Sequence, residues 1–216
     1  FCVKKCAYCD FLSGPAGEKE KEEYVKMLVD EIRNCPDTVQ NYRVISIFFG
    51  GGTPSLLTGE QIGRLMDTVR EIFTLDEDAE ITMEMNPGTV TEEKLRKYRQ
   101  AGVNRLSIGL QSVNDEELRL LGRIHTYEEF REAYHLARAN GFSNINVDLI
   151  SAIPGQTVES WRRTLEQVMA LSPEHISAYS LILEEGTTFY KKYVEDEAKE
   201  GPKLPDEDAE RQMYWD

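Results

Sequence analysis

The chain has 216 residues, 40 % of them hydrophobic, and is long enough to bury one sizeable core. Its 39 acidic and 25 basic side chains give a net charge of -14, which disfavours nucleic acid and anionic lipid surfaces as partners. No apolar run approaches the ~20 residues that span a bilayer and no signal segment opens the chain, so we expect a cytoplasmic protein.

The first segment, "FCVKKCAYCDF", spaces Cys2, Cys6 and Cys9 as C-x3-C-x2-C. Four cysteines are too few for a disulfide scaffold, and in a reducing compartment such a triplet points to metal binding. Structural zinc usually takes two separated pairs of ligands, so zinc fits poorly. Three thiolates on one loop could instead hold three irons of a [4Fe–4S] cluster and leave one iron open. Cys35, at the end of a predicted helix, is expected to be structural.

Helical and strand patterns then alternate along the chain. Helices are predicted over 18–34, 59–73, 91–101, 127–140 and 157–171, and strands over 43–49, 79–85, 104–110, 144–150 and 175–181. This alternation predicts an α/β fold with a parallel sheet and outer helices. A cluster loop in such a barrel should follow a strand, so we expect a first strand upstream of Phe1, giving a partial (β/α)6 TIM-like barrel.

The chain divides into two predicted parts. The barrel core is expected over 1–182, with the cluster loop at 1–11. Residues 183–216 are expected to begin a C-terminal extension that is truncated here. Within that extension, the charged stretch 195–212 contains Pro and Gly and is predicted to be mainly a solvated connector.

Polar and glycine-rich residues gather where the predicted strands end. They are Gly50, Gly51 and Gly52 in "FGGGTPS", Glu84 in "MEMNPG", Gln111 in "GLQS", and Asp148, Ser177 and Tyr179 on the last two strands. Ligands and chemistry occupy this rim in βα barrels. Glycines permit close backbone approach to a ligand. Glu84 alternates with Met83 and Met85, so it points inward if the methionines face the helices.

These residues resemble the radical S-adenosylmethionine (SAM) superfamily, in which an aromatic residue, here Tyr8, precedes the third cysteine. The resemblance implies that Cys2, Cys6 and Cys9 ligate a [4Fe–4S] cluster whose open iron binds SAM. It also implies an electron donor of the flavodoxin or ferredoxin type. By a narrower similarity, to the oxygen-independent coproporphyrinogen III oxidase family, the SAM pocket contains Gly51, Gly52, Thr53, Glu84, Gln111, Arg123 and Asp148. His125, beside Arg123, is expected to be structural.

Along nearly its whole length the chain is similar to the oxygen-independent coproporphyrinogen III oxidase family. The oxidases carry a further cysteine two positions after the third, where this chain has Phe11. Phe11 instead resembles the heme chaperone branch, HemW. That branch implies heme as bound cargo and a heme-receiving client protein. Oxidative decarboxylation of coproporphyrinogen III stays the alternative, so whether the chain acts as an enzyme stays open.

The heme-associated His-Asn motif of the HemW branch does not precede "MYWD" at 213–216. His125, His135 and His175 therefore carry only a weak prediction of heme contact.

Overall fold

A computed structural model describes residues 1–196 and 201–216. The described residues form one parallel sheet in the order β1-β2-β3-β4-β5. The strands are β1 (Arg43–Phe49), β2 (Thr74–Met85), β3 (Arg105–Gln111), β4 (Ile145–Ser151) and β5 (His175–Ser180). This sheet confirms the predicted α/β partial barrel, with five parallel strands in the described residues.

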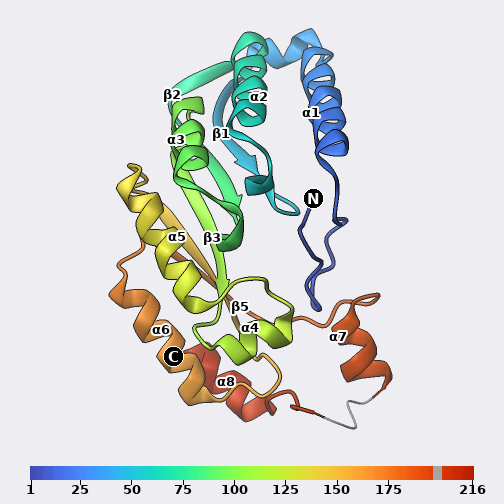
Figure 1. The fold of residues 1–216 in the computed structure, drawn as a ribbon, viewed down its shortest axis with the longest axis vertical. Coiled ribbons are helices and arrows are strands. Elements are labelled where there is room, and N and C mark those ends of the chain that lie inside the picture. The colour runs from blue at the N-terminus through green and yellow to red at the C-terminus, as the bar shows by residue number, and fades with distance from the viewer. Residues whose placement is uncertain (197–200) are drawn as a thin grey trace.

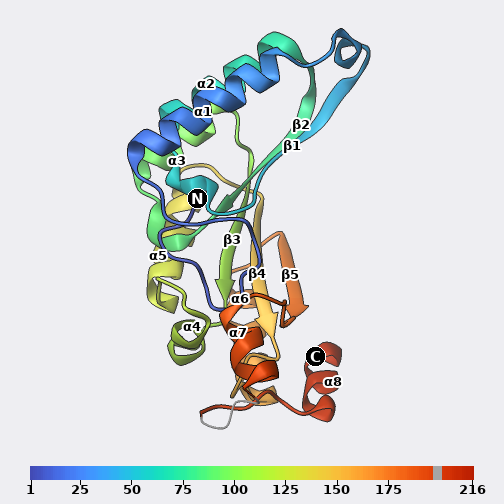
Figure 2. The ribbon, with the colours of Figure 1, turned by 90° about the vertical axis from the view of Figure 1, so that its right-hand side faces the viewer.

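The described helices are α1 (Glu18–Arg33), α2 (Gly59–Ile72), α3 (Glu92–Ala101), α4 (Asp115–Leu121), α5 (Tyr127–Ala139), α6 (Val158–Ala170), α7 (Thr188–Tyr190) and α8 (Glu207–Trp215). Helices α2 to α6 lie between strands in the chain, whereas α1 precedes β1 and α7 and α8 follow β5. In Figures 1 and 2, α1, α2, α3, α5 and α6 cover one face of the curved sheet. Short 3-10 turns occupy Asp37–Asn41, Pro54–Leu56 and Pro87–Thr89, and a π-helical turn occupies Lys191–Glu195. None of the described helices is long and apolar enough to cross a membrane.

Threonine caps define where the crossover helices begin. The side chains of Thr58, Thr91, Thr126 and Thr157 each accept a hydrogen bond from the backbone N–H three residues later, at the start of α2, α3, α5 and α6. Such a bond satisfies one of the N–H groups that has no partner inside the helix. Each βα turn therefore ends at a fixed residue, which sets the length of the loops at the rim.

Alternation along the strands separates an apolar outer face from a polar inner face. Met83 and Met85 are buried in the main core, whereas Glu84 between them lines a cavity on the inner side. The same alternation places Leu106 and Ile108 in the core and Ser107 on the inner side. The inward direction predicted for Glu84 is therefore confirmed.

Three elements differ from the sequence prediction. β2 begins at Thr74, earlier than the predicted residue 79. The acidic residues 76–78 interrupt its apolar pattern, and the pairing of β1 with β2 is irregular between Val44 and Ser46, beside these residues. Helix α4 is too short to show a helical period. Helix α8 occupies part of the predicted connector, and Met213 is buried where the Trp161 indole N–H donates to its carbonyl over 2.8 Å.

Candidate functional site

A cavity of about 590 Å³ opens at the carboxyl ends of the strands. Every residue that the sequence assigns to the site lines it: Cys2, Cys6, Cys9, Gly51, Gly52, Thr53, Glu84, Gln111, Arg123 and Asp148. Phe11 and Tyr179 line it as well. Cys35 and His125 are not among its lining residues. The fold thus gathers residues from the first loop and from strands β2 to β5 around one space.

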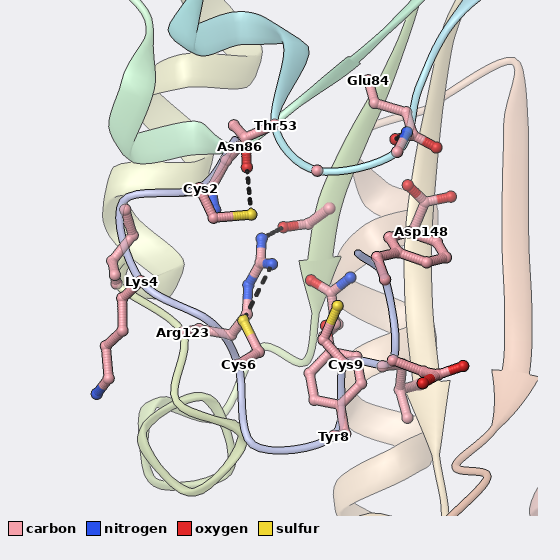
Figure 3. A pocket seen from close by; sticks show the side chains of 18 of the residues that line it. Cys2, Lys4, Cys6, Tyr8, Cys9, Thr53, Glu84, Asn86, Arg123 and Asp148 are labelled. Atoms are coloured by element: carbon pink, nitrogen blue, oxygen red, sulfur yellow. Dashed lines mark hydrogen bonds between the residues drawn. The ribbon is translucent and has the colours of Figure 1, made fainter. Parts of the chain in front are cut away.

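The three cysteines of the first loop turn their sulfurs into the cavity (Figure 3). The Cys2 thiol donates to Ser13 Oγ over 3.3 Å and accepts from Thr53 Oγ1 over 3.5 Å. Arg123 Nη1 lies 3.9 Å from Cys6 Sγ. Within residues 1–196 and 201–216, no three His, Cys, Asp or Glu side chains meet closely enough to hold a single metal ion. In a cluster each cysteine binds a different iron, so the sulfurs need not meet at one point.

The glycine turn after β1 packs directly against the start of the chain. The Thr53 N–H donates to the Phe1 carbonyl over 2.6 Å. A Cβ at Gly52 would lie 2.5 Å from that same oxygen, so no side chain fits at this position. Gly51 has φ 105°, which favours glycine, and its N–H donates to Glu84 Oε2 over 3.0 Å. Three separate segments are therefore joined at this edge of the cavity.

Asp148 is the centre of a hydrogen-bond network on the inner face of the sheet. Its carboxylate accepts from Ser107 Oγ over 3.0 Å, from Asn146 Nδ2 over 2.7 Å and from the Tyr179 hydroxyl over 3.0 Å. Ser107 also accepts from Asn146 over 2.8 Å. These bonds fix the direction of the carboxylate. Ser107 and Asn146 were not predicted as site residues, although both alternate along their strands with inward-facing positions.

Two carboxylates share this apolar-walled space. Burial raises the pKa of Asp148 despite its hydrogen-bond donors. Burial likewise raises the pKa of Glu84, and the charge of Asp148 raises it further. Charged groups in such surroundings are costly without partners, so the cavity favours a ligand with amino or hydroxyl groups.

Gln111 and Arg123 present polar atoms that have no hydrogen-bond partner in the described part of the chain. Gln111 has φ 72°, follows an irregularity in β3, and its Oε1 is buried and unbonded. Arg123 Nη2 donates to the Gly109 carbonyl over 2.7 Å, whereas its buried Nε is unbonded. Buried polar atoms are normally satisfied, so these two atoms are exceptions among the described residues.

The remaining predicted positions lie apart from this cavity. The Cys35 thiol follows α1 and lies 3.8 Å from the Glu31 carbonyl. His125 is buried, and burial together with the nearby Arg123 lowers its pKa to about 3. His175 lies at the other end of β5, where its Nδ1 contacts Arg105 over 3.0 Å.

Comparison with known proteins places the chain among iron–sulfur proteins. Residues 1–168 match the radical SAM superfamily. Heme chaperone HemW of Escherichia coli is 43 % identical over 100 % of this chain and 54 % of that protein. HemW of Haemophilus influenzae is 39 % identical over 100 % of this chain and 55 % of that protein.

The solved structure of coproporphyrinogen III oxidase (HemN) from Escherichia coli superposes with a TM-score of 0.87 and 31 % identity, covering 99 % of this chain and 48 % of that one. The chain spans about half the length of the curated relatives it matches. Membership of the matched family implies SAM and a [4Fe–4S] cluster as cofactors. With the family matched over residues 1–168 on a parallel half-barrel, the chain belongs to the radical SAM superfamily.

Proposed function

We propose that this chain is the cofactor-binding barrel of a heme chaperone. The observation that carries the proposal is Phe11, which stands at the position of the further oxidase cysteine and lines the cavity with its side chain 56 % exposed. A phenyl ring supplies no thiol there. The similarity to HemW over the whole chain supports the same function.

In this proposal Cys2, Cys6 and Cys9 hold the [4Fe–4S] cluster. These residues fit such a cluster, because three thiols from one loop line one cavity. Among the described residues that line this cavity there is no fourth cysteine, so one iron would have no cysteine ligand. When bound and reduced, such a cluster would supply one electron for the reductive cleavage of SAM. The electron would come from a flavodoxin- or ferredoxin-type donor. Free thiols in this loop require a reducing compartment, so we place the protein in the cytoplasm.

The polar residues of the cavity are proposed to bind SAM beside the cluster. SAM carries an amino group, a carboxylate, hydroxyls and an adenine. Glu84 and Asp148 offer acceptors for amino and hydroxyl groups. Gln111 and Arg123 line the same cavity and add an amide and a guanidinium group. Gly51 and Gly52 keep the backbone clear of side chains where the ligand approaches.

The alternative function is oxidative decarboxylation of coproporphyrinogen III. The TM-score of 0.87 to the oxidase HemN is compatible with this alternative, but the same barrel accommodates either role, so the fold does not distinguish them. Heme as cargo and a client protein that receives it are properties of the chaperone proposal only.

Titration of heme into the full-length, anaerobically reconstituted protein tests the proposal. We expect a saturable change in the heme absorption spectrum with a stoichiometry near one. The same heme titration of a Phe11→Cys variant, which carries the oxidase-type residue at this position, is compared with that of the wild type. A spectrum that changes only in proportion to added heme, without saturation, would contradict the chaperone function.

A further inference from the structure

We infer that the turn at 187–193 and the end of α4 hold the cluster loop in place, with Phe189 as the positioning residue. This inference rests on the proposed role of Cys6 and Cys9 as cluster ligands. In Figures 1 and 2 the first loop reaches from α1 to a position beside α4 and α7.

The loop is held through both backbone groups of Ala7, which lies between Cys6 and Cys9. The Ala7 N–H donates to the Leu121 carbonyl over 2.9 Å, and the Ala7 carbonyl accepts from the Phe189 N–H over 2.9 Å. Leu121 ends α4 and Phe189 stands in the first turn of α7. Carbonyls at the end of a helix and N–H groups at its start have no partner within the helix. Two helix ends thus bracket the loop.

A threonine cap fixes the start of α7 so that the Phe189 N–H faces the loop. Thr187 Oγ1 accepts from the Tyr190 N–H over 3.1 Å and donates to the Glu184 carbonyl over 2.7 Å. Thr187 is itself buried. The turn is therefore anchored on both sides of the residue that bonds Ala7.

Side-chain packing reinforces the backbone contacts. A second hydrophobic cluster, separate from the main core, buries Leu121, Ile150, Ile153 and Phe189. Ala7, Tyr8 and Tyr193 pack against this cluster, and the rings of Phe189 and Tyr193 meet edge to face at 5.3 Å. Phe189 is only 2 % exposed. The Phe189 ring therefore belongs to the cluster against which residues 7 and 8, between the second and third cysteines, pack.

Gly122 allows the loop to approach α4 closely. It ends the helix with φ 80°, and a Cβ there would lie 3.3 Å from the Ala7 nitrogen. A side chain at this position would be strained and would crowd the bond between Ala7 and Leu121.

The test compares two identical truncations in different cores of the full-length protein. Phe189→Ala removes a ring from the second hydrophobic cluster, and Phe142→Ala removes a ring that is 1 % exposed in the main core. Hydrogen exchange of residues 2–12 is measured in cluster-free protein, and iron loss to a chelator is measured after reconstitution. We expect Phe189→Ala to accelerate loop exchange and iron loss by about tenfold or more, since local opening depends on local contacts.

Phe142→Ala is expected to lower global stability while loop exchange rises no more than exchange in the sheet. Equal acceleration of the loop by both variants, or none with Phe189→Ala, would overturn the inference. If Phe189→Ala does not fold, Thr187→Val removes the cap hydroxyl, and faster loop exchange is again expected. If the wild-type protein never binds iron, the proposed cluster is refuted. Faster loop exchange in Phe189→Ala would still support the positioning of the loop in that case.

Discussion

The cysteines of the first loop differ in surroundings from the fourth cysteine. Cys2, Cys6 and Cys9 line the cavity, whereas Cys35 is not among the lining residues and its thiol lies by the Glu31 carbonyl of α1. We predict that alanine at any of the first three positions abolishes stable cluster binding and that Cys35→Ala does not. Iron content and visible absorption after anaerobic reconstitution measure this. Loss of the cluster in Cys35→Ala alone would show that the ligand assignment is wrong.

Asp148 also makes a prediction about pH. The pKa of Asp148 is raised above its usual value of 3.8 in the folded protein. There is therefore a pH range above 3.8 in which the folded state keeps a proton on this carboxyl group and the unfolded state has lost it. The free energy of unfolding therefore falls as pH rises through this range. Asp148→Asn removes that fall, so the variant should gain stability relative to the wild type between about pH 4 and about pH 7.

Denaturant unfolding of both cofactor-free proteins at the two pH values measures the difference. Asp148 accepts hydrogen bonds from Ser107, Asn146 and Tyr179. The charged groups that interact electrostatically with it are Glu84 and Arg105. A stability difference that is constant with pH would show that the carboxylate is ionised throughout.

At the scale of elements, the glycine turn after β1 joins the cluster loop to the sheet. Gly52→Ala would place a Cβ against the Phe1 backbone, and overpacking of this kind costs about 1–3 kcal/mol. We predict lower stability and lower iron retention. Gly63→Ala is the control, since its Cβ meets nothing within 4 Å and alanine in a helix stabilises by about 1 kcal/mol. Full iron retention in Gly52→Ala would contradict the close packing.

The elements also show what sequence can predict here. Crossover helices and buried strands follow from apolar periodicity, and the threonine caps mark where helices start. The beginning of β2 shows no apolar alternation, because acidic residues occupy it. Helix α4 shows no helical period, because it spans few turns. The contact of Ala7 with Phe189 joins distant parts of the chain and leaves no local signal.

For the site, sequence motifs and strand alternation select residues that line one cavity in the structure. The cysteine spacing, the glycine turn and the inward position of Glu84 are all local patterns. The bonds that orient Asp148 come from three strands and depend on the register of the sheet. Register is a property of the folded sheet, so only the structure reveals how that carboxylate is held.

At the scale of the whole molecule, a parallel half-barrel brings the first loop, four strands and the segment after β5 to one rim. This arrangement supports radical SAM chemistry in general, and the chain spans about half the length of its relatives. The choice between chaperone and oxidase therefore depends on the full-length protein, with Phe11 as the residue in this chain that favours the chaperone.

The most direct measurement is an anaerobic turnover assay on the full-length protein with reduced cluster, SAM and coproporphyrinogen III, run beside the HemN oxidase as a positive control. The chaperone function predicts no conversion to protoporphyrinogen IX by a preparation that contains iron and sulfide and binds heme. Stoichiometric or catalytic decarboxylation by that same preparation would contradict it and establish the oxidase activity instead.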